Sequence, residues 1–95
     1  MNDVLFDWDQ HNIVLITLHT VTPEEAEEVL LGDAVELDFD EEAAEPRWSY
    51  VGETASGRIL EVVITIRMEK MRVVTAFEPI RRIERMYLKA KAGRA

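Results

Sequence analysis

The hydrophobic period of this chain changes at Gly32, and the change constrains the fold more than any other feature. Apolar residues recur at helical spacing before Gly32, whereas residues 35–40 (VELDFD) alternate between apolar and acidic side chains. Alternation with a period of two is typical of a strand with one wet face. Further strands are expected where β-branched and aromatic residues gather, at 48–51, 59–67 and 72–77, with turns at 55–57 and 68–71. The pattern predicts an antiparallel meander of three to four main strands.

Two helices are expected before Gly32, and a short strand at Val4–Trp8 is expected to precede them. Asp9 is a suitable N-cap for a helix that runs to about His19. The segment Thr22-Pro23-Glu24-Glu25 combines a Thr N-cap, Pro at the first helical position and Glu three residues after the cap. It therefore predicts a second helix, which ends at Gly32.

A third helix is expected to begin at Pro79. Its apolar and basic residues fall on opposite sides, with Ile80, Ile83, Met86 and Tyr87 on one and Arg81, Arg82, Arg85 and Lys89 on the other. The elements together predict an α+β fold, in which an antiparallel sheet is combined with two N-terminal helices and a C-terminal helix.

Charge is divided unevenly along the chain. Residues 1–46 hold fourteen of the nineteen acids and no Lys or Arg, whereas residues 47–95 hold all eleven bases and five acids. The net charge of −8 argues against general affinity for nucleic acid, because phosphate binding needs a basic surface. The acids are explained most simply as solvated helix and loop surface, although the net figure leaves room for a basic face.

Length and composition exclude several classes of protein. At 95 residues the chain is expected to form one domain, 1–95. The absence of Cys excludes a disulfide framework, a thiolate nucleophile and a Cys-based zinc site. His11 and His19 are eight residues apart rather than four, so no metal site and no cofactor are expected. No apolar run approaches the ~20 residues that cross a bilayer. The N-terminus is acidic, so a cytoplasmic protein is expected.

A series of short motifs resembles the BrnT family of type II toxins. The first half contributes FDWD (6–9), Asn12, His19 and VTPEEAEEV (21–29), and the second half contributes VGET (51–54), Gly57-Arg58, RVVTA (72–76) and Glu84 to Tyr87. No single motif is specific, but their order covers nearly the whole chain. The resemblance implies a RelE-like ribonuclease that is neutralised by a ribbon-helix-helix antitoxin.

The chain departs from that family pattern at positions where the family is usually polar or cationic. Leu15 stands where His or another polar residue is frequent, and Leu18 where Lys or Arg usually precedes the His that ends the first helix. Thr20 replaces the Gly that commonly follows that His, and Phe77 replaces an Arg. The apolar residues Leu15, Leu18 and Phe77 predict weakened catalysis.

Cleaving RNA without a metal requires a base for the ribose 2′-OH, an acid for the leaving oxygen and cations that stabilise charge on phosphorus. His19 has the side chain whose ordinary pKa, about 6.5, best suits proton transfer. Arg58 and Arg72 lie on neighbouring expected strands and are suited to hold a phosphate by bidentate contacts. Glu84 is expected to act as a base or to orient an arginine. The RNA-binding residues are expected on the third helix: Arg81, Arg82, Arg85 and Lys89.

Each assignment has a structural alternative. His19 can simply cap the end of the first helix, and Arg58 and Arg72 can pair across strands with Glu61 or Glu69. The basic side of the third helix can be solvated surface. Three aromatic residues could stack on bases, although burial is the usual role of such side chains: Trp8, Trp48 and Tyr50.

Two main functional hypotheses therefore remain open. In the first, the protein is a ribonuclease toxin that binds RNA and is covered by a ribbon-helix-helix antitoxin. In the second, it is a non-catalytic relative that binds the antitoxin and acts with it as a co-repressor. An unrelated ligand-binding domain is a third option. A membrane partner is not expected, and a homodimer is considered for either hypothesis.

Overall fold

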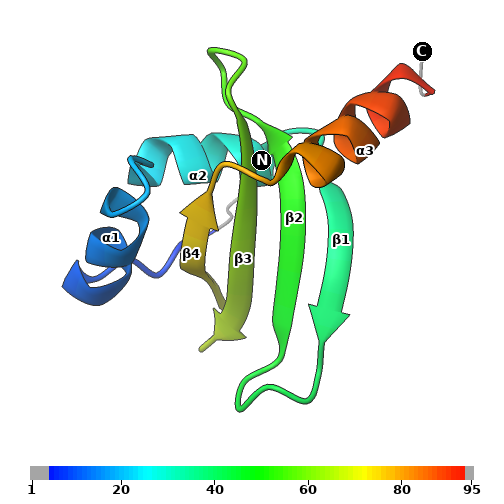
Figure 1. Ribbon diagram of the computed structural model, residues 1–95. Helices are drawn as coiled ribbons and strands as arrows, with labels where there is room; N and C mark the ends of the chain where they lie inside the picture. The colour runs from blue at the N-terminus through cyan, green and yellow to red at the C-terminus, as the bar shows by residue number, and fades with distance from the viewer. Residues whose placement is uncertain (1–4, 94–95) are drawn as a thin grey trace.

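The computed structural model describes residues 5–93. Three helices and four strands follow one another along the chain (Figure 1): α1 (Gln10–Thr17), α2 (Pro23–Leu31), β1 (Val35–Asp40), β2 (Arg47–Glu53), β3 (Ile59–Arg67), β4 (Lys70–Phe77) and α3 (Arg81–Ala92). The strands form one antiparallel sheet in the order β1-β2-β3-β4. The α+β fold with two N-terminal helices and one C-terminal helix is therefore confirmed.

Both N-terminal helices begin with reciprocal capping boxes. The Asp9 side chain accepts from the Asn12 backbone N–H at 3.2 Å, and the Asp9 N–H donates to the Asn12 side chain at 2.8 Å. Thr22 and Glu25 repeat the arrangement at α2, whose bounds match the predicted helix. Each box satisfies backbone donors that have no partner within the helix, so both helix starts are locally encoded.

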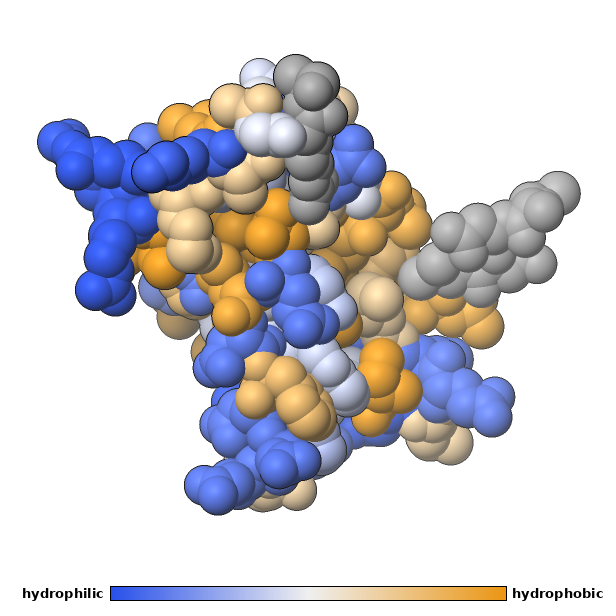
Figure 2. Space-filling view, turned by 90° about the vertical axis from the view of Figure 1, so that its right-hand side faces the viewer, coloured by the Kyte–Doolittle hydropathy of each residue, from blue (hydrophilic) through white to orange (hydrophobic). Residues whose placement is uncertain are grey.

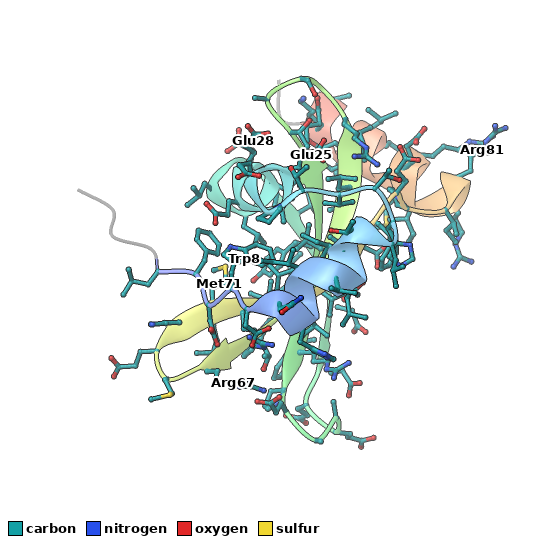
Figure 3. All side chains as sticks on the ribbon, turned by 90° about the vertical axis from the view of Figure 1, so that its left-hand side faces the viewer. Trp8, Glu25, Glu28, Arg67, Met71 and Arg81 are labelled. Atoms are coloured by element: carbon teal, nitrogen blue, oxygen red, sulfur yellow. The ribbon has the colours of Figure 1, made fainter. Side chains whose placement is uncertain are left out.

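The helices lie on different sides of the sheet. Figure 3, viewed from the β4 edge, shows α1 in front and α2 and α3 on opposite sides of the strands. Helix α2 packs against β2 and β3, whereas α1 packs against β4. The Asn12 amide of α1 donates to the Val73 carbonyl of β4 at 3.1 Å, so the helix occupies a backbone acceptor at the sheet edge.

The main core lies between the sheet and the two N-terminal helices. Its buried side chains come from the helices, the loop between them and the two last strands: Ile16, Val21, Ala26, Val29, Leu60, Val62, Ile64, Val73 and Ala76. Gly52 of β2 faces this core, and α2 approaches it so closely that a Cβ atom there would lie 3.0 Å from Cγ1 of Val29. Trp8, Trp48 and Tyr50 are half-buried against the same core.

Several local predictions differ from the structure. Helix α3 begins at Arg81 rather than at Pro79, because Ile80 is the N-cap and has an extended backbone (φ −64°, ψ 157°). Instead of a strand at Val4–Trp8, the described residues of that segment contain one isolated parallel bridge, between Phe6 and Met71; Val4 lies outside the described residues. The last strand starts at Lys70, because Met68 and Glu69 turn the chain with positive φ angles of 52° and 64°.

Helix α3 is anchored to the sheet mainly through one residue. Tyr87 is 2% exposed, whereas Ile80 and Met86 remain 62% and 44% exposed. The Tyr87 hydroxyl donates to Glu53 of β2 at 3.0 Å, and Lys91 forms an ion pair with the same carboxylate. Hydrophobic residues remain visible between projecting hydrophilic residues on the face drawn in Figure 2.

Candidate active site

His19 lies in the loop between α1 and α2, at one end of the sheet. Helix α1 ends at Thr17, two residues before the predicted end, and the chain then turns through Thr20, whose φ is 58°. This left-handed conformation favours glycine and disfavours a β-branched residue. The exposed imidazole packs against Phe77 at the end of β4, with ring centroids 5.8 Å apart and planes inclined by 60°. His19 is therefore accessible and has an apolar neighbour.

Arg58 precedes β3 at the same end of the sheet and binds the loop that carries His19. Its Nη1 donates to the Thr20 carbonyl at 2.7 Å and lies 3.1 Å and 3.2 Å from the two Glu25 oxygens. Its Nε donates to Glu78 at 3.4 Å. The backbone of Thr22, followed by Arg58, holds the pKa of Glu25 below its usual value. The guanidinium is thus bound by two carboxylates and a carbonyl.

Arg72 lies at the other end of α1. Its Nη2 donates to Asp9 at 3.1 Å, and its Nη1 lies 3.0 Å and 3.4 Å from carboxylate oxygens of Asp9 and Asp7. Nη1 is buried and forms these two ion pairs, but neither contact has the geometry of a hydrogen bond. The hydrogen bond to Asp9 raises the pKa of Arg72 and lowers the pKa of Asp9. Arg72 therefore ties β4 to the start of α1.

The structure does not bring the two predicted phosphate-binding arginines together. Arg58 contacts the loop after α1 and Arg72 contacts its N-cap, and a helix of eight residues is about 12 Å long. Both arginines form ion pairs, but the predicted partners Glu61 and Glu69 are wrong. The actual partners are far away in the sequence: Glu25 and Glu78 for Arg58, and Asp7 and Asp9 for Arg72.

The other predicted site residues lie on α3. Glu84 is half-buried in the first turn of this helix. Figure 3 shows Arg81 pointing away from the body of the molecule. All four predicted RNA-binding bases are exposed, and within residues 5–93 no ion pair engages them: Arg81, Arg82, Arg85 and Lys89. They form the α3 basic face, which carries positive charge free of carboxylate partners.

The three apolar departures occupy different environments. Leu18 is 75% exposed, and Leu15 is half-buried on α1. Phe77 is half-buried, and its ring packs against that of His19. A cation at position 77 would therefore lie directly beside the candidate proton-transfer group, which makes Phe77 the departure with the clearest chemical consequence.

Glu61 was not among the predicted site residues, yet it lies near this end of the sheet. It pairs in register with Val51 on one side and Phe77 on the other. Because strand residues alternate between faces, Glu61 faces away from the core that contains Leu60 and Val62. We call the cross-strand row of Val51, Glu61 and Phe77 on this second face the open-face strip, in which Val51 is fully buried and the other two are half-buried. A lone acid within the apolar run ILEVVITI was the available sequence signal.

Within residues 5–93 the candidate site is an open surface, because no enclosed pocket is present. The same part of the chain holds no group of three or more His, Asp or Glu residues arranged to bind a metal ion. None of its helices is long and apolar enough to cross a membrane. Proton transfer and electrostatic contacts by side chains are the chemistry that these residues offer.

Comparison with known proteins supplies a family but no individual relative. Searches of curated proteins and of solved structures found no match. The profile of a family described as "Ribonuclease toxin, BrnT, of type II toxin-antitoxin system" matches residues 8–82, a span that contains His19, Arg58, Glu61, Arg72 and Phe77. The chain therefore belongs to the BrnT family of ribonuclease toxins of type II toxin-antitoxin systems.

Proposed function

We propose that this protein is a metal-independent endoribonuclease that cleaves RNA slowly, with His19 and Arg58 as the central residues of its active site. The observation that carries the proposal is their placement at one end of the sheet, where Arg58 binds the carbonyl of Thr20, the residue after His19. Family membership supplies the reaction class. In this scheme His19 transfers a proton and Arg58 attracts the phosphate.

Slow cleavage follows from the neutralisation of the arginines. Glu25 and Glu78 bind Arg58, and Asp7 and Asp9 bind Arg72, so a phosphate would have to compete with carboxylates at either guanidinium. Loss of one electrostatic group typically costs on the order of 100 to 1,000-fold in rate. With Phe77 in place of a cation beside His19, the imidazole is left without a free positive charge in contact with it among the described residues.

The α3 basic face is the expected RNA contact. Its four bases are exposed and unpaired within residues 5–93, unlike Arg58 and Arg72. Phosphate contacts of this kind position a nucleic acid without reading its sequence. We expect the double variant Arg82→Ala, Arg85→Ala to bind RNA more weakly and with less sensitivity to salt. Each phosphate contact releases counterions from the RNA, so a protein with fewer contacts releases fewer counterions on binding.

A second candidate function is a non-catalytic protein that binds the antitoxin and acts with it as a co-repressor. The same neutralised arginines and Phe77 favour it, because they preserve the scaffold while removing free cations. In both cases the proposed partner is a ribbon-helix-helix antitoxin. A basic partner would be attracted to the acidic first half of the chain, and its binding should weaken as salt increases.

Expression without antitoxin separates the two candidates. The ribonuclease proposal predicts a weak but reproducible slowing of bacterial growth that His19→Ala abolishes. The matched control is His11→Ala. This substitution removes the second histidine of the chain, which is exposed on α1, and should leave the slowing of growth unchanged. Unimpaired growth with the wild-type protein at the same soluble level would favour the non-catalytic candidate.

A further inference from the structure

Glu61 occupies the middle of the open-face strip, beside the group that packs on His19. Glu61 is directly opposite Phe77 in the β3–β4 register, so their Cβ atoms are about 4.5–5.5 Å apart. Phe77 in turn lies 5.8 Å from His19 between ring centroids. Phe77 therefore lies between Glu61, its register partner on β3, and His19, whose ring packs against it.

No residue in the described part of the chain forms a hydrogen bond or ion pair with the Glu61 side chain. Its other strand neighbour, Val51, is fully buried, so apolar groups flank Glu61 in both directions across the sheet. Burial raises the pKa of Glu61. Such a setting favours the protonated form, because a half-buried carboxylate without a partner is poorly solvated.

A second carboxylate on the same face of the sheet, Glu53, is already engaged by partners from α3. Glu53 of β2 accepts from Tyr87 and pairs with Lys91, and both of these partners come from α3. The Lys91 ammonium, followed by the Tyr87 hydroxyl, holds the pKa of Glu53 below its usual value. The two carboxylates therefore have pKa values shifted in opposite directions, so Glu53 is the more readily ionised and Glu61 the more readily protonated.

We propose that Glu61 is the general acid of RNA cleavage in this protein and that His19 is the general base. The inference rests on the proposed ribonuclease function and assigns a residue to its second proton transfer. Neutral His19 takes the proton of the ribose 2′-OH, and the 2′ oxygen forms a bond to phosphorus. The bond from phosphorus to the 5′ oxygen breaks, and that oxygen takes the proton of the Glu61 carboxyl group. The products are a 2′,3′-cyclic phosphate and a 5′-hydroxyl, with no other reactant consumed.

Glu61→Gln tests this role because it keeps the size of the side chain and removes the transferable proton. Its matched control is Glu69→Gln, which makes the same chemical change in the exposed turn before β4. Single-turnover cleavage would be measured on an RNA oligonucleotide and on the same oligonucleotide with sulfur in place of the bridging 5′ oxygen. Sulfur leaves readily as a thiolate and does not need an acid.

We expect Glu61→Gln to slow cleavage of the ordinary RNA about 100-fold or more, in line with the usual contribution of a general acid. The sulfur-containing RNA should be cleaved at nearly the wild-type rate, and Glu69→Gln should resemble wild type on both substrates. The fall in wild-type rate at high pH that reports Glu61 deprotonation should also disappear in Glu61→Gln.

Equal losses on the two substrates would overturn the proposal, since they would indicate a structural role for Glu61. Unchanged cleavage of ordinary RNA by Glu61→Gln would overturn it as well while leaving the ribonuclease function intact. If the wild-type protein cleaves neither substrate, the proposed function itself fails, and the assignment of Glu61 fails with it.

Discussion

Gly52→Ala should destabilise the protein through the contact between α2 and the sheet. An added Cβ atom would lie 3.0 Å from Cγ1 of Val29 and 3.2 Å from both Cα and Cβ of Ala34. The Ala34 contact involves backbone, which cannot rotate away as a flexible side chain can. Overpacking of this kind costs about 1–3 kcal/mol. Replacing Gly by Ala also lowers the conformational entropy of the unfolded chain, which stabilises the folded protein by about 0.4–1 kcal/mol. The free energy of unfolding is therefore expected to fall by about 1–2 kcal/mol in total.

The assay is equilibrium unfolding in urea, followed by circular dichroism and repeated as a thermal scan. For a domain of this size, 1 kcal/mol corresponds to about 4–8 °C in Tm, so Gly52→Ala should melt about 4–16 °C below wild type. Gly93→Ala is the control, because a Cβ atom there meets its nearest neighbours at 3.6 Å, an ordinary contact distance. Gly93→Ala should be neutral or slightly stabilising.

A double-mutant cycle tests the physical cause. Val29→Ala removes the methyl group that the new Cβ would meet, so the two substitutions together should cost less than the sum of their separate effects, by about 0.5 kcal/mol or more. Strict additivity, or a Gly52→Ala protein as stable as wild type, would refute the steric argument. The result bears on the site because α2 carries Glu25, which holds Arg58.

Other substitutions test burial, electrostatics and catalysis. Leu60→Ala should lower the free energy of unfolding by about 2–5 kcal/mol, because this side chain is fully buried. Leu18 is 75% exposed, so Leu18→Ala should change the free energy of unfolding by less than about 0.5 kcal/mol. Urea unfolding measures both effects. Lys91 lowers the pKa of Glu53 in the folded protein. The ionised Glu53 carboxylate therefore contributes to the free energy of unfolding above its unfolded pKa, and this contribution is lost as pH falls below about 4.5. Between pH 7 and pH 3 the urea midpoint should therefore fall less in the Lys91→Met variant than in the wild-type protein. Equal falls in the two proteins would contradict the role of Lys91. Phe77→Arg should raise RNA cleavage by placing a cation beside the candidate base, and unchanged cleavage by the folded variant would count against the importance of this departure.

The most accurate sequence predictions concern elements with local signals. Helix α2 has the predicted bounds because Thr22, Pro23 and Glu25 specify its start within four residues. The four strands were recognisable because alternation and turn residues are also local. The end of α1 was placed too late because the positive φ of Thr20, which turns the chain, has no local signal in a β-branched residue.

The partners of the charged residues could not be predicted in the same way. Arg72 meets Asp9 across 63 positions of sequence, and Arg58 meets Glu25 across 33. These pairings depend on how α1 and α2 dock on the sheet, which no local pattern specifies. The role proposed for Glu61 could not be predicted for a related reason: it depends on the register that places Glu61 opposite Phe77 and on the lack of a partner within residues 5–93.

Single-turnover cleavage of RNA by the purified wild-type protein and its His19→Ala variant tests the central claim most directly. Metal chelator should be present throughout, and both proteins should be shown by circular dichroism to be folded. The account predicts slow wild-type cleavage that leaves 2′,3′-cyclic phosphate ends, and a loss of about 100-fold or more in His19→Ala. Cleavage that persists undiminished in His19→Ala, or a folded wild-type protein that cleaves no RNA, would contradict it.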